Sequence, residues 1–261
     1  MAQVVERILG KDEVGSSSLP SSSISGNNSS PIFLYMEKYM NIIAHIQNDY
    51  TSKFGVPRQS GLVNEEESLI IFEPKYRVAE AIRGLENFNY IWLLWEFSEV
   101  KDKKWSPTVR PPRLGGNKRV GVFATRSPFR PNPIGLSSVK IKSIEKTEQY
   151  GYIIKVQGAD LMNGTPIYDI KPYLPYADCH TDASNGFADT NFKKLSVIIS
   201  DSLKNNFPKD KLSALIATLE QDPRPQYIDD PSREFGLTFG EYNIKFYVEN
   251  NVLTVTKISL K

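Results

Sequence analysis

The segment that restricts the fold most strongly runs from Gly121 to Gly135 and reads GVFATRSPFRPNPIG. Its prolines each hold the backbone angle φ, lack an amide hydrogen, and keep the preceding residue out of the helical region. This segment therefore cannot be a helix or an interior strand, and we expect a stiff loop between two strands. Arg126 and Arg130 on this loop carry planar, permanently charged side chains that suit a carboxylate or a phosphate. The loop is either a binding element or a stiff crossover whose arginines pair with nearby acids.

Short apolar runs bounded by turn residues make up most of the chain after residue 40. They predict strands at 41–46, 69–72, 90–97, 119–124, 134–144, 152–161 and 167–174. One short helix is expected over 74–84, because Pro74 suits its first turn and Gly84 its end. This order lacks the alternation of strand and helix that builds a parallel sheet. The pattern favours a mainly β fold, with a β-barrel as the N-terminal domain.

The two ends of the chain differ from this central part. A Ser/Gly/Asn tract occupies most of residues 1–35, and we expect a disordered N-terminal extension there. Beyond a polar stretch, residues 201–221 have a helical pattern, and residues 242–260 alternate across a Glu-Asn-Asn turn as a β-hairpin does. The expected domains are a barrel over 36–180 and a small α+β C-terminal domain over 190–261.

Basic residues gather in one part of the chain although the net charge is only +2. Between Lys101 and Lys142, eleven lysines and arginines accompany a single acid, Asp102. Such a block is commonly a solvated face. Because this one is rich in Pro and Gly, loops that meet an anion such as RNA phosphate are the favoured interpretation.

Several classes of protein are not expected. The single cysteine, Cys179, excludes an internal disulfide and suits a reducing compartment. The two histidines, His45 and His180, lack metal-ligand spacing, so no metal is predicted. The longest apolar run, residues 90–97, is far shorter than the roughly 20 residues of a membrane helix, and no secretory signal is evident. We expect a cytoplasmic protein without a membrane partner.

Five blocks in the same order give the chain a family resemblance. They read KFGVPRQSGLV, AIRGLENFNYIWLLWEF, WSPTVRPPRLGGNKRVGVFATRSPFRPNPIG, GTPIYDIKPYLPYAD and DPRPQY. Over residues 40–261 the chain resembles the TsaA-like (YaeB/VirR, TrmO) family of S-adenosylmethionine-dependent tRNA methyltransferases. The resemblance implies a β-barrel catalytic domain, a small C-terminal domain and a homodimer. It also implies methyl transfer to N6 of N6-threonylcarbamoyladenosine at tRNA position 37.

The resemblance also implies a cofactor pocket. The matching positions are Pro57, Arg58, Gln59, Phe97, Ser98, Arg126, Leu136, Asn163, Gly164, Thr165 and Pro166. The chain departs from the family pattern at Ser98 and Asn163, where the family has His and Asp. A hydroxyl and an amide still form hydrogen bonds. Arg126 or Arg58 could bind the carboxylate of S-adenosylmethionine, while Phe97, Leu136 and the 163–165 main chain could hold its adenine.

The catalytic residues stay unassigned at this point. Asp160 and Asp169 flank the turn that contains Gly164, and either could accept a proton or cap that turn. The residues expected to contact tRNA are Arg110, Arg113, Arg130, Arg224 and Tyr227. Two alternatives remain open: an enzyme that methylates a different acceptor, and an RNA-binding protein without catalysis.

Overall fold

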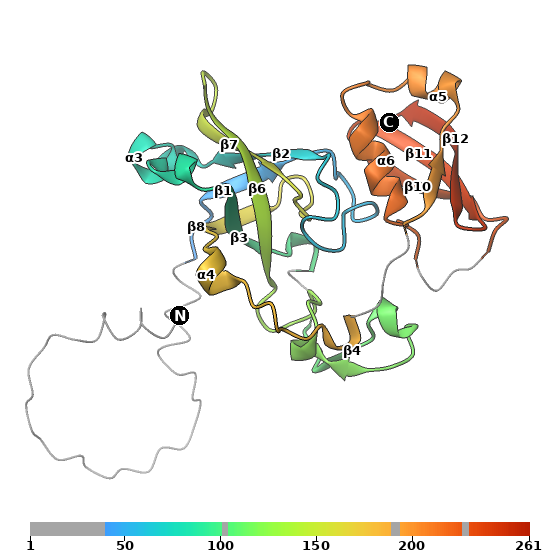
Figure 1. The fold of residues 1–261 in the computed structure, drawn as a ribbon, viewed down its shortest axis with the longest axis horizontal. Coiled ribbons are helices and arrows are strands. Elements are labelled where there is room, and N and C mark those ends of the chain that lie inside the picture. Colours follow the sequence, from blue (N-terminus) through green and yellow to red (C-terminus); the bar gives the residue numbers. More distant parts are fainter. Residues whose placement is uncertain (1–39, 101–103, 189–193, 226–229) are drawn as a thin grey trace, which may run out of the picture. The chain divides into compact units, whose positions relative to one another are not determined.

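The computed structural model describes residues 40–100, 104–188, 194–225 and 230–261, and of Arg113 only the backbone. The extension expected over 1–35 lies outside these residues. Strands predominate over helices throughout the described part of the chain, so the prediction of a mainly β fold is confirmed (Figure 1).

Six antiparallel strands form a closed barrel. They are β1 (Ala44–Gln47), β2 (Glu67–Phe72), β3 (Tyr90–Glu96), β6 (Ile134–Thr147), β7 (Gly151–Gln157) and β8 (Pro166–Pro172). The order is β1-β2-β7-β6-β3-β8, and β1 pairs with both β2 and β8, which closes the sheet (Figure 1). Alternate residues point inward, as in β2, where Ser68, Ile70 and Phe72 are buried between partly or fully exposed neighbours. The interior of the barrel is one hydrophobic core.

Several segments differ from the sequence prediction. The strand expected over 152–161 ends at Gln157, before Gly158 with its φ of 77°, and the helical pattern over 201–221 is divided into Asp201–Asn205 and Leu212–Glu220. The helix expected over 74–84 is two short turns, η1 (Pro74–Tyr76) and α3 (Ala79–Ile82), and a third turn, η2 (Leu85–Asn87), follows it. Val78 is extended and interrupts the helical backbone, whereas Gly84, with a φ of 87°, ends it as expected. Few of these residues are buried, so tertiary packing adds little support for a longer helix.

The strand expected over 119–124 is also shorter than predicted. Only β5 (Val120–Gly121) is extended, and it pairs with β4 (Thr108–Val109). The next residues form η5 (Val122–Ala124), because the Thr125 hydroxyl donates to the Val122 carbonyl at 2.8 Å and bends the chain there. Three further turns are η3 (Ser98–Val100), η4 (Pro112–Leu114) and η6 (Gly186–Ala188), and α4 spans Pro175–Asp178.

The C-terminal residues form a separate four-stranded sheet with two helices. The elements are β9 (Ser196–Ile198), α5 (Asp201–Asn205), α6 (Leu212–Glu220), β10 (Phe235–Phe239), β11 (Tyr242–Glu249) and β12 (Val252–Leu260). The strand order is β10-β11-β12-β9, in which β9 runs parallel to β12. The predicted hairpin is confirmed as β11–β12. Asn250 and Asn251 take φ values of 50° and 62°, which a tight hairpin turn requires.

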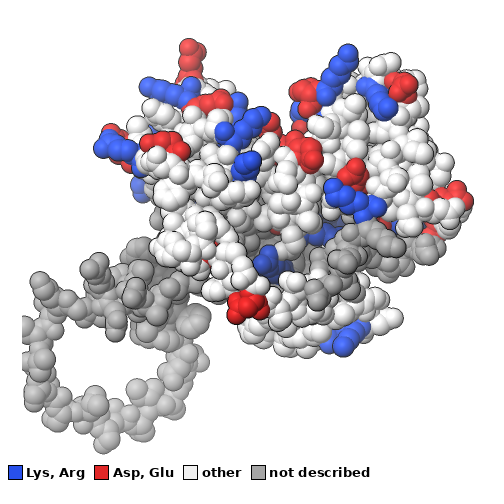
Figure 2. All heavy atoms as spheres, viewed as in Figure 1, with Lys and Arg blue, Asp and Glu red and all other residues white. Residues whose placement is uncertain are grey.

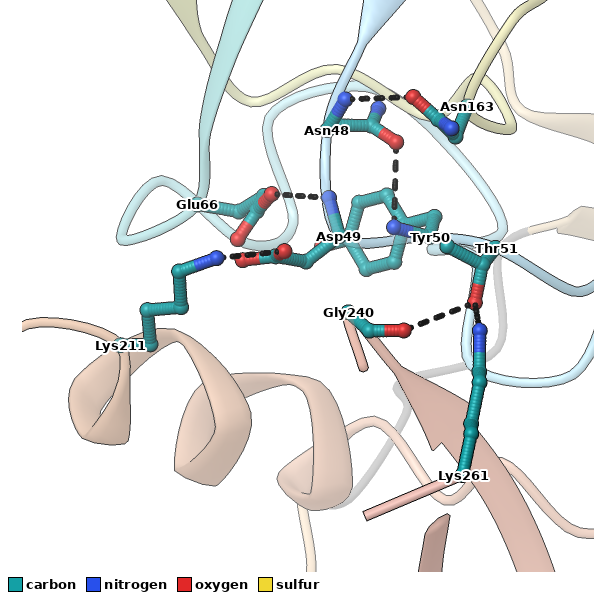
Figure 3. A network of polar contacts seen from close by, with 9 residues as sticks. All are labelled: Asn48, Asp49, Tyr50, Thr51, Glu66, Asn163, Lys211, Gly240 and Lys261. Atoms are coloured by element: carbon teal, nitrogen blue, oxygen red, sulfur yellow. Dashed lines mark hydrogen bonds and ion pairs between the residues drawn. The ribbon is translucent and has the colours of Figure 1, made fainter. Parts of the chain in front are cut away.

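The segment that follows β1 links the barrel to the C-terminal sheet (Figure 3). Tyr50 is 1% exposed and belongs to the hydrophobic core of the C-terminal residues. On one side of it, Lys211 pairs with Asp49 at 2.7 Å, and on the other the Thr51 hydroxyl donates to the Gly240 carbonyl at 3.3 Å. The Asp49 amide also donates to the Glu66 carboxyl at 3.1 Å.

Glu66 in this network is expected to make stability depend on pH. Its side chain is buried, and burial first of all, then the Asp49 carboxylate, raises its pKa to about 7, although the Asp49 amide and Lys211 oppose the shift. Because the unfolded chain loses this proton near pH 4.5 and the folded chain does not, the stabilisation is complete below pH 4.5 and is lost as pH rises to about 7. The loss between acidic and mildly alkaline pH should be on the order of 2–3 kcal/mol.

Urea unfolding of the Glu66→Gln variant at both ends of this range tests the expectation. Gln keeps the size of the side chain and an oxygen for the Asp49 amide, so the variant should lose this part of the pH dependence. Glu65→Gln is the matched control, because Glu65 is the exposed neighbour. Equal pH dependence in the parent and in the Glu66 variant would contradict the assignment.

Candidate functional site

A cavity of about 620 Å³ opens at the end of strands β3 and β6. Four segments far apart in sequence line it: residues 53–59, 95–100, 126–136 and 160–165 contribute, with gaps, to its wall. Its volume is within the range of pockets that hold a small organic molecule or cofactor. The cavity is therefore the candidate functional site.

The cavity brings together most of the residues expected to bind a cofactor. Pro57, Arg58, Gln59, Phe97, Ser98, Arg126, Leu136 and Thr165 all line it. Arg126 donates a hydrogen bond to the Gln59 side chain, and Gln59 in turn donates to the Arg58 carbonyl. These contacts join the proline-rich loop to the 57–59 segment. Leu136 is 54% exposed although it is a large apolar residue, which leaves an apolar surface available on this wall.

The other three predicted residues do not line the cavity. These are Asn163, Gly164 and Pro166, in the turn before β8. The Asn163 side-chain oxygen accepts a hydrogen bond from the Asn48 main-chain amide at 3.0 Å, and the main-chain amide of Asn163 donates to the Tyr50 carbonyl at 2.8 Å. Gly164 donates to the Ile46 carbonyl at 2.8 Å. The turn is thus bound to the end of β1, and only Thr165 reaches the cavity.

Gly135 makes room for an aromatic wall. Trp95 on β3 lies directly opposite Gly135 on β6, and a Cβ built on Gly135 would be 2.2 Å from the indole. The indole can therefore cross the β6 backbone, where its Nε1 donates to the Ser137 hydroxyl at 2.9 Å. Phe97 packs against Trp95 with ring centroids 4.3 Å apart. Both rings line the cavity.

Sequence reasoning missed several residues of this wall. The cavity is also lined by Lys53, Val56, Trp95, Glu96, Glu99, Val100, Pro128, Phe129, Ile134, Gly135 and Met162. The β3 run was predicted as a strand, but its apolar residues occupy both faces, so alternation alone did not single out Trp95 and Glu96. The only sequence evidence that pointed to Trp95 and Glu96 was their position next to Phe97 and Ser98, which match the family's cofactor pocket.

Two acidic groups in the cavity have distinct surroundings. Burial raises the pKa of the Asp160 carboxyl, while a hydrogen bond from the Ser137 hydroxyl, 2.5 Å from it, acts in the opposite direction. Glu96 is 9% exposed and accepts a hydrogen bond from Tyr168. Burial, followed by this bond to a carboxylate, raises the pKa of the Tyr168 hydroxyl. The cavity thus combines carboxylates with the guanidinium groups of Arg58, Arg126 and Arg130.

The residues expected to contact tRNA do not gather at one place. Arg130 lines the cavity, whereas Arg110 is exposed in the segment that follows β4. Arg224 lines a smaller cavity of about 170 Å³ and pairs with both oxygens of Asp222 at 2.8 and 2.9 Å. The Arg113 side chain and all of Tyr227 lie outside the described residues. On the face shown in Figure 2, basic and acidic side chains are interspersed.

The described part of the chain has neither a membrane-spanning helix nor a cluster of metal ligands. None of its helices combines the length and the apolar character that a membrane crossing requires. Within the same residues, no group of three or more His, Cys, Asp or Glu side chains is arranged to hold a metal ion.

Comparison with known proteins gives consistent matches. The family model of the tRNA-methyltransferase O N-terminal domain matches residues 45–179, and that of the TrmO C-terminal domain matches residues 193–261. The tRNA (adenine(37)-N6)-methyltransferase of Escherichia coli strain K12 is 40% identical over 217 residues, which cover 79% of this chain and 91% of the relative. A protein of the same name from Eikenella corrodens is 40% identical over 173 residues, which cover 66% of this chain and 97% of the relative.

A solved structure agrees with these matches. The crystal structure of TrmO from Pseudomonas aeruginosa superposes with a TM-score of 0.69 at 28% identity, covering 85% of this chain and 97% of that chain. The resemblance found in the sequence blocks is therefore confirmed. Because both family models match, and the chain covers 91% of a relative with which it is 40% identical, it belongs to the TrmO family of tRNA methyltransferases.

Proposed function

We propose that this chain transfers a methyl group from S-adenosylmethionine to N6 of N6-threonylcarbamoyladenosine at position 37 of tRNA. The chain is an S-adenosylmethionine-dependent tRNA methyltransferase, as its family and its relatives' names indicate. The threonylcarbamoyl group on the acceptor is the finer part of the proposal. The observation that best supports methyl transfer from S-adenosylmethionine is the cavity itself, which gathers Arg58, Phe97, Arg126 and Leu136 from separate segments.

The residues of the cavity fit S-adenosylmethionine. The aromatic rings of Trp95 and Phe97, together with exposed Leu136, suit an adenine ring. Arg126 or Arg58 would bind the carboxylate, and Glu96 would favour a cationic group nearby. When bound, S-adenosylmethionine supplies a methyl group on a positively charged sulfur. The contribution of this chain is to hold donor and acceptor in line and to exclude competing water.

The remaining parts of the proposal concern organisation and partners. We assign catalysis to the barrel over 36–180 and a supporting role to the α+β domain over 190–261, in a cytoplasmic homodimer. Arg110, Arg113, Arg130, Arg224 and Tyr227 are the proposed tRNA contacts. Arg224 borders a small cavity, and its ion pair with Asp222 would have to be exchanged for a tRNA phosphate.

Nucleoside mass spectrometry of tRNA tests the proposed acceptor. The purified chain and S-adenosylmethionine are incubated with tRNA that carries threonylcarbamoyladenosine and, separately, with tRNA that has unmodified adenine at position 37. Only the first tRNA should gain one methyl group on the modified nucleoside. Methylation of the unmodified tRNA would show that the acceptor is wrong, and cofactor binding without methyl transfer would favour another substrate.

Arg126→Ala is expected to weaken S-adenosylmethionine binding by about 10- to 100-fold, because a charged hydrogen bond to a carboxylate is worth about 1.5–3 kcal/mol. Calorimetric titration of the purified variant measures this change. Arg119→Ala is the control, since Arg119 is exposed and donates to Thr108, outside the cavity. If the Arg126 variant binds S-adenosylmethionine as tightly as the parent does, another residue binds the cofactor carboxylate, and Arg58 is the first candidate.

A further inference from the structure

One carboxylate of the cavity, that of Asp160, is held by the Ser137 hydroxyl, which the cofactor assignment does not use. Asp160 lies between β7 and β8, lines the cavity, and accepts a hydrogen bond from the Ser137 hydroxyl at 2.5 Å. Ser137 accepts in turn from Trp95 Nε1 at 2.9 Å. Because an indole nitrogen can only donate, the serine oxygen receives that hydrogen and directs its own toward Asp160.

These two hydrogen bonds, from Trp95 to Ser137 and from Ser137 to Asp160, form a relay that fixes the orientation of the Asp160 carboxylate. Ser137 is 1% exposed and Trp95 is 6% exposed, so water has little access to either side chain and does not compete for these hydrogen bonds. Trp95 is itself confined by Gly135 beneath it and by the ring of Phe97. One oxygen of Asp160, Oδ1, is therefore tied to the barrel wall while the residue borders the space where substrates would meet.

The charges around Asp160 leave its carboxyl with a pKa above the usual value. Burial is the largest cause, and the Ser137 hydroxyl, backbone amides and the positive charge of Arg126 oppose it. The other charged residues that line the cavity are Lys53, Arg58, Glu96, Glu99 and Arg130. A carboxylate with a raised pKa accepts a proton more readily than an ordinary aspartate does.

The proposed reaction needs such a group. The N6 nitrogen of threonylcarbamoyladenosine carries one hydrogen and is conjugated to a carbonyl, which makes it a poor nucleophile. A bond forms between N6 and the methyl carbon, the bond from that carbon to sulfur breaks with its electron pair staying on sulfur, and the N6 hydrogen leaves as a proton. Resting on the proposed function, we infer that Asp160 is the proton acceptor of the methyl transfer, oriented by Ser137 and Trp95.

Two other carboxylates, those of Asp169 and Glu96, are alternatives for this role. Asp169, on the opposite side of the turn, does not line the cavity and pairs with Lys171 at 2.7 Å. Glu96 lines the cavity and, like Asp160, accepts a hydrogen bond from a hydroxyl, that of Tyr168, so the Glu96→Gln variant is needed to distinguish the two. The geometry therefore separates Asp160 from Asp169, which sequence reasoning alone treated alike.

The test compares Asp160→Asn with Asp169→Asn. Asn retains an oxygen that can accept from Ser137, but it cannot take up a proton near neutral pH. The Asp160 variant should lose about 100-fold or more in kcat while its affinities for S-adenosylmethionine and for tRNA, at fixed salt, stay near those of the parent. The parent's rate should fall toward acidic pH as Asp160 becomes protonated, and the pH–rate profile of the variant should lack this acidic limb. The Asp169 variant should behave as the parent.

A second measurement does not depend on turnover. Because Asp160 connects through Ser137 to the Trp95 indole, protonation of the carboxyl should change the tryptophan fluorescence of the cofactor-free protein. The parent should show a titration step above pH 3.8 that Asp160→Asn lacks. The same step in both proteins would contradict the relay.

Three results would overturn the inference. They are a kcat near the parent's in Asp160→Asn, a loss confined to cofactor affinity in that variant, and removal of the acidic limb by Glu96→Gln rather than by Asp160→Asn. A parent protein that methylates no tRNA would overturn the proposed function and this inference with it. An active parent beside an equally active Asp160→Asn overturns only the inference.

Discussion

Replacing Gly135 with alanine is expected to destabilise the barrel by about 3 kcal/mol and to weaken cofactor binding, although only one methyl group is added. The new Cβ would lie 2.2, 2.4 and 2.6 Å from three carbons of the Trp95 indole. The indole cannot move away easily, because its nitrogen is bonded to Ser137 and its ring packs on Phe97. The clash is with a rigid, buried ring, so the strands themselves must shift.

Urea unfolding and cofactor titration of the variant measure both effects. Gly121→Ala is the matched control, because Gly121 is at the other end of the proline-rich loop with a φ of −58°, and a Cβ there would meet nothing within 4 Å. The control should unfold within about 0.5 kcal/mol of the parent. If the two alanine variants were equally stable, the packing of Trp95 over Gly135 would not hold.

Tyr50→Ala is expected to cost about 3–5 kcal/mol of unfolding free energy, as the truncation of a buried aromatic side chain commonly does. Tyr50 is 1% exposed, and its ring meets that of Phe239 edge to face with centroids 6.1 Å apart. Its main-chain carbonyl also accepts a hydrogen bond from the main-chain amide of Asn163, so the residue connects the turn before β8 to the C-terminal core.

Tyr176→Ala is the control for this prediction. The Tyr176 side chain is 87% exposed, so its truncation removes the same atoms without leaving a cavity. Its unfolding free energy should stay within about 0.5 kcal/mol of the parent. An equally small loss in the two variants would mean that the burial of Tyr50 contributes little to the stability of the C-terminal core.

Local sequence patterns anticipated many of the elements. The barrel strands β3 and β6 and the β11–β12 hairpin follow from apolar periodicity and turn residues, since these patterns reflect the backbone conformations that each short segment prefers. Patterns of this kind were less informative where side chains bend the chain locally. The Thr125 hydroxyl shortened the strand expected at 119–124, and extended Val78 divided the helix expected at 74–84.

Motif blocks anticipated much of the candidate site as well. Residues in the PRQ segment, in the aromatic strand and in the proline-rich loop all line one cavity. Asn163 is different. Its hydrogen bonds to Asn48 and Tyr50 bind it to the barrel end, and no local pattern contains that partnership.

The amino-acid sequence alone was sufficient for the fold class, the stiff arginine loop and the family, because each depends on local conformational preference or on long matching blocks. Tertiary structure was needed to place Trp95 over Gly135, to join Ser137 to Asp160, and to separate Asp160 from Asp169. The physical reason is strand register. Residues distant in sequence meet only when the barrel closes, and a shift of one residue between β3 and β6 would turn these side chains to opposite faces.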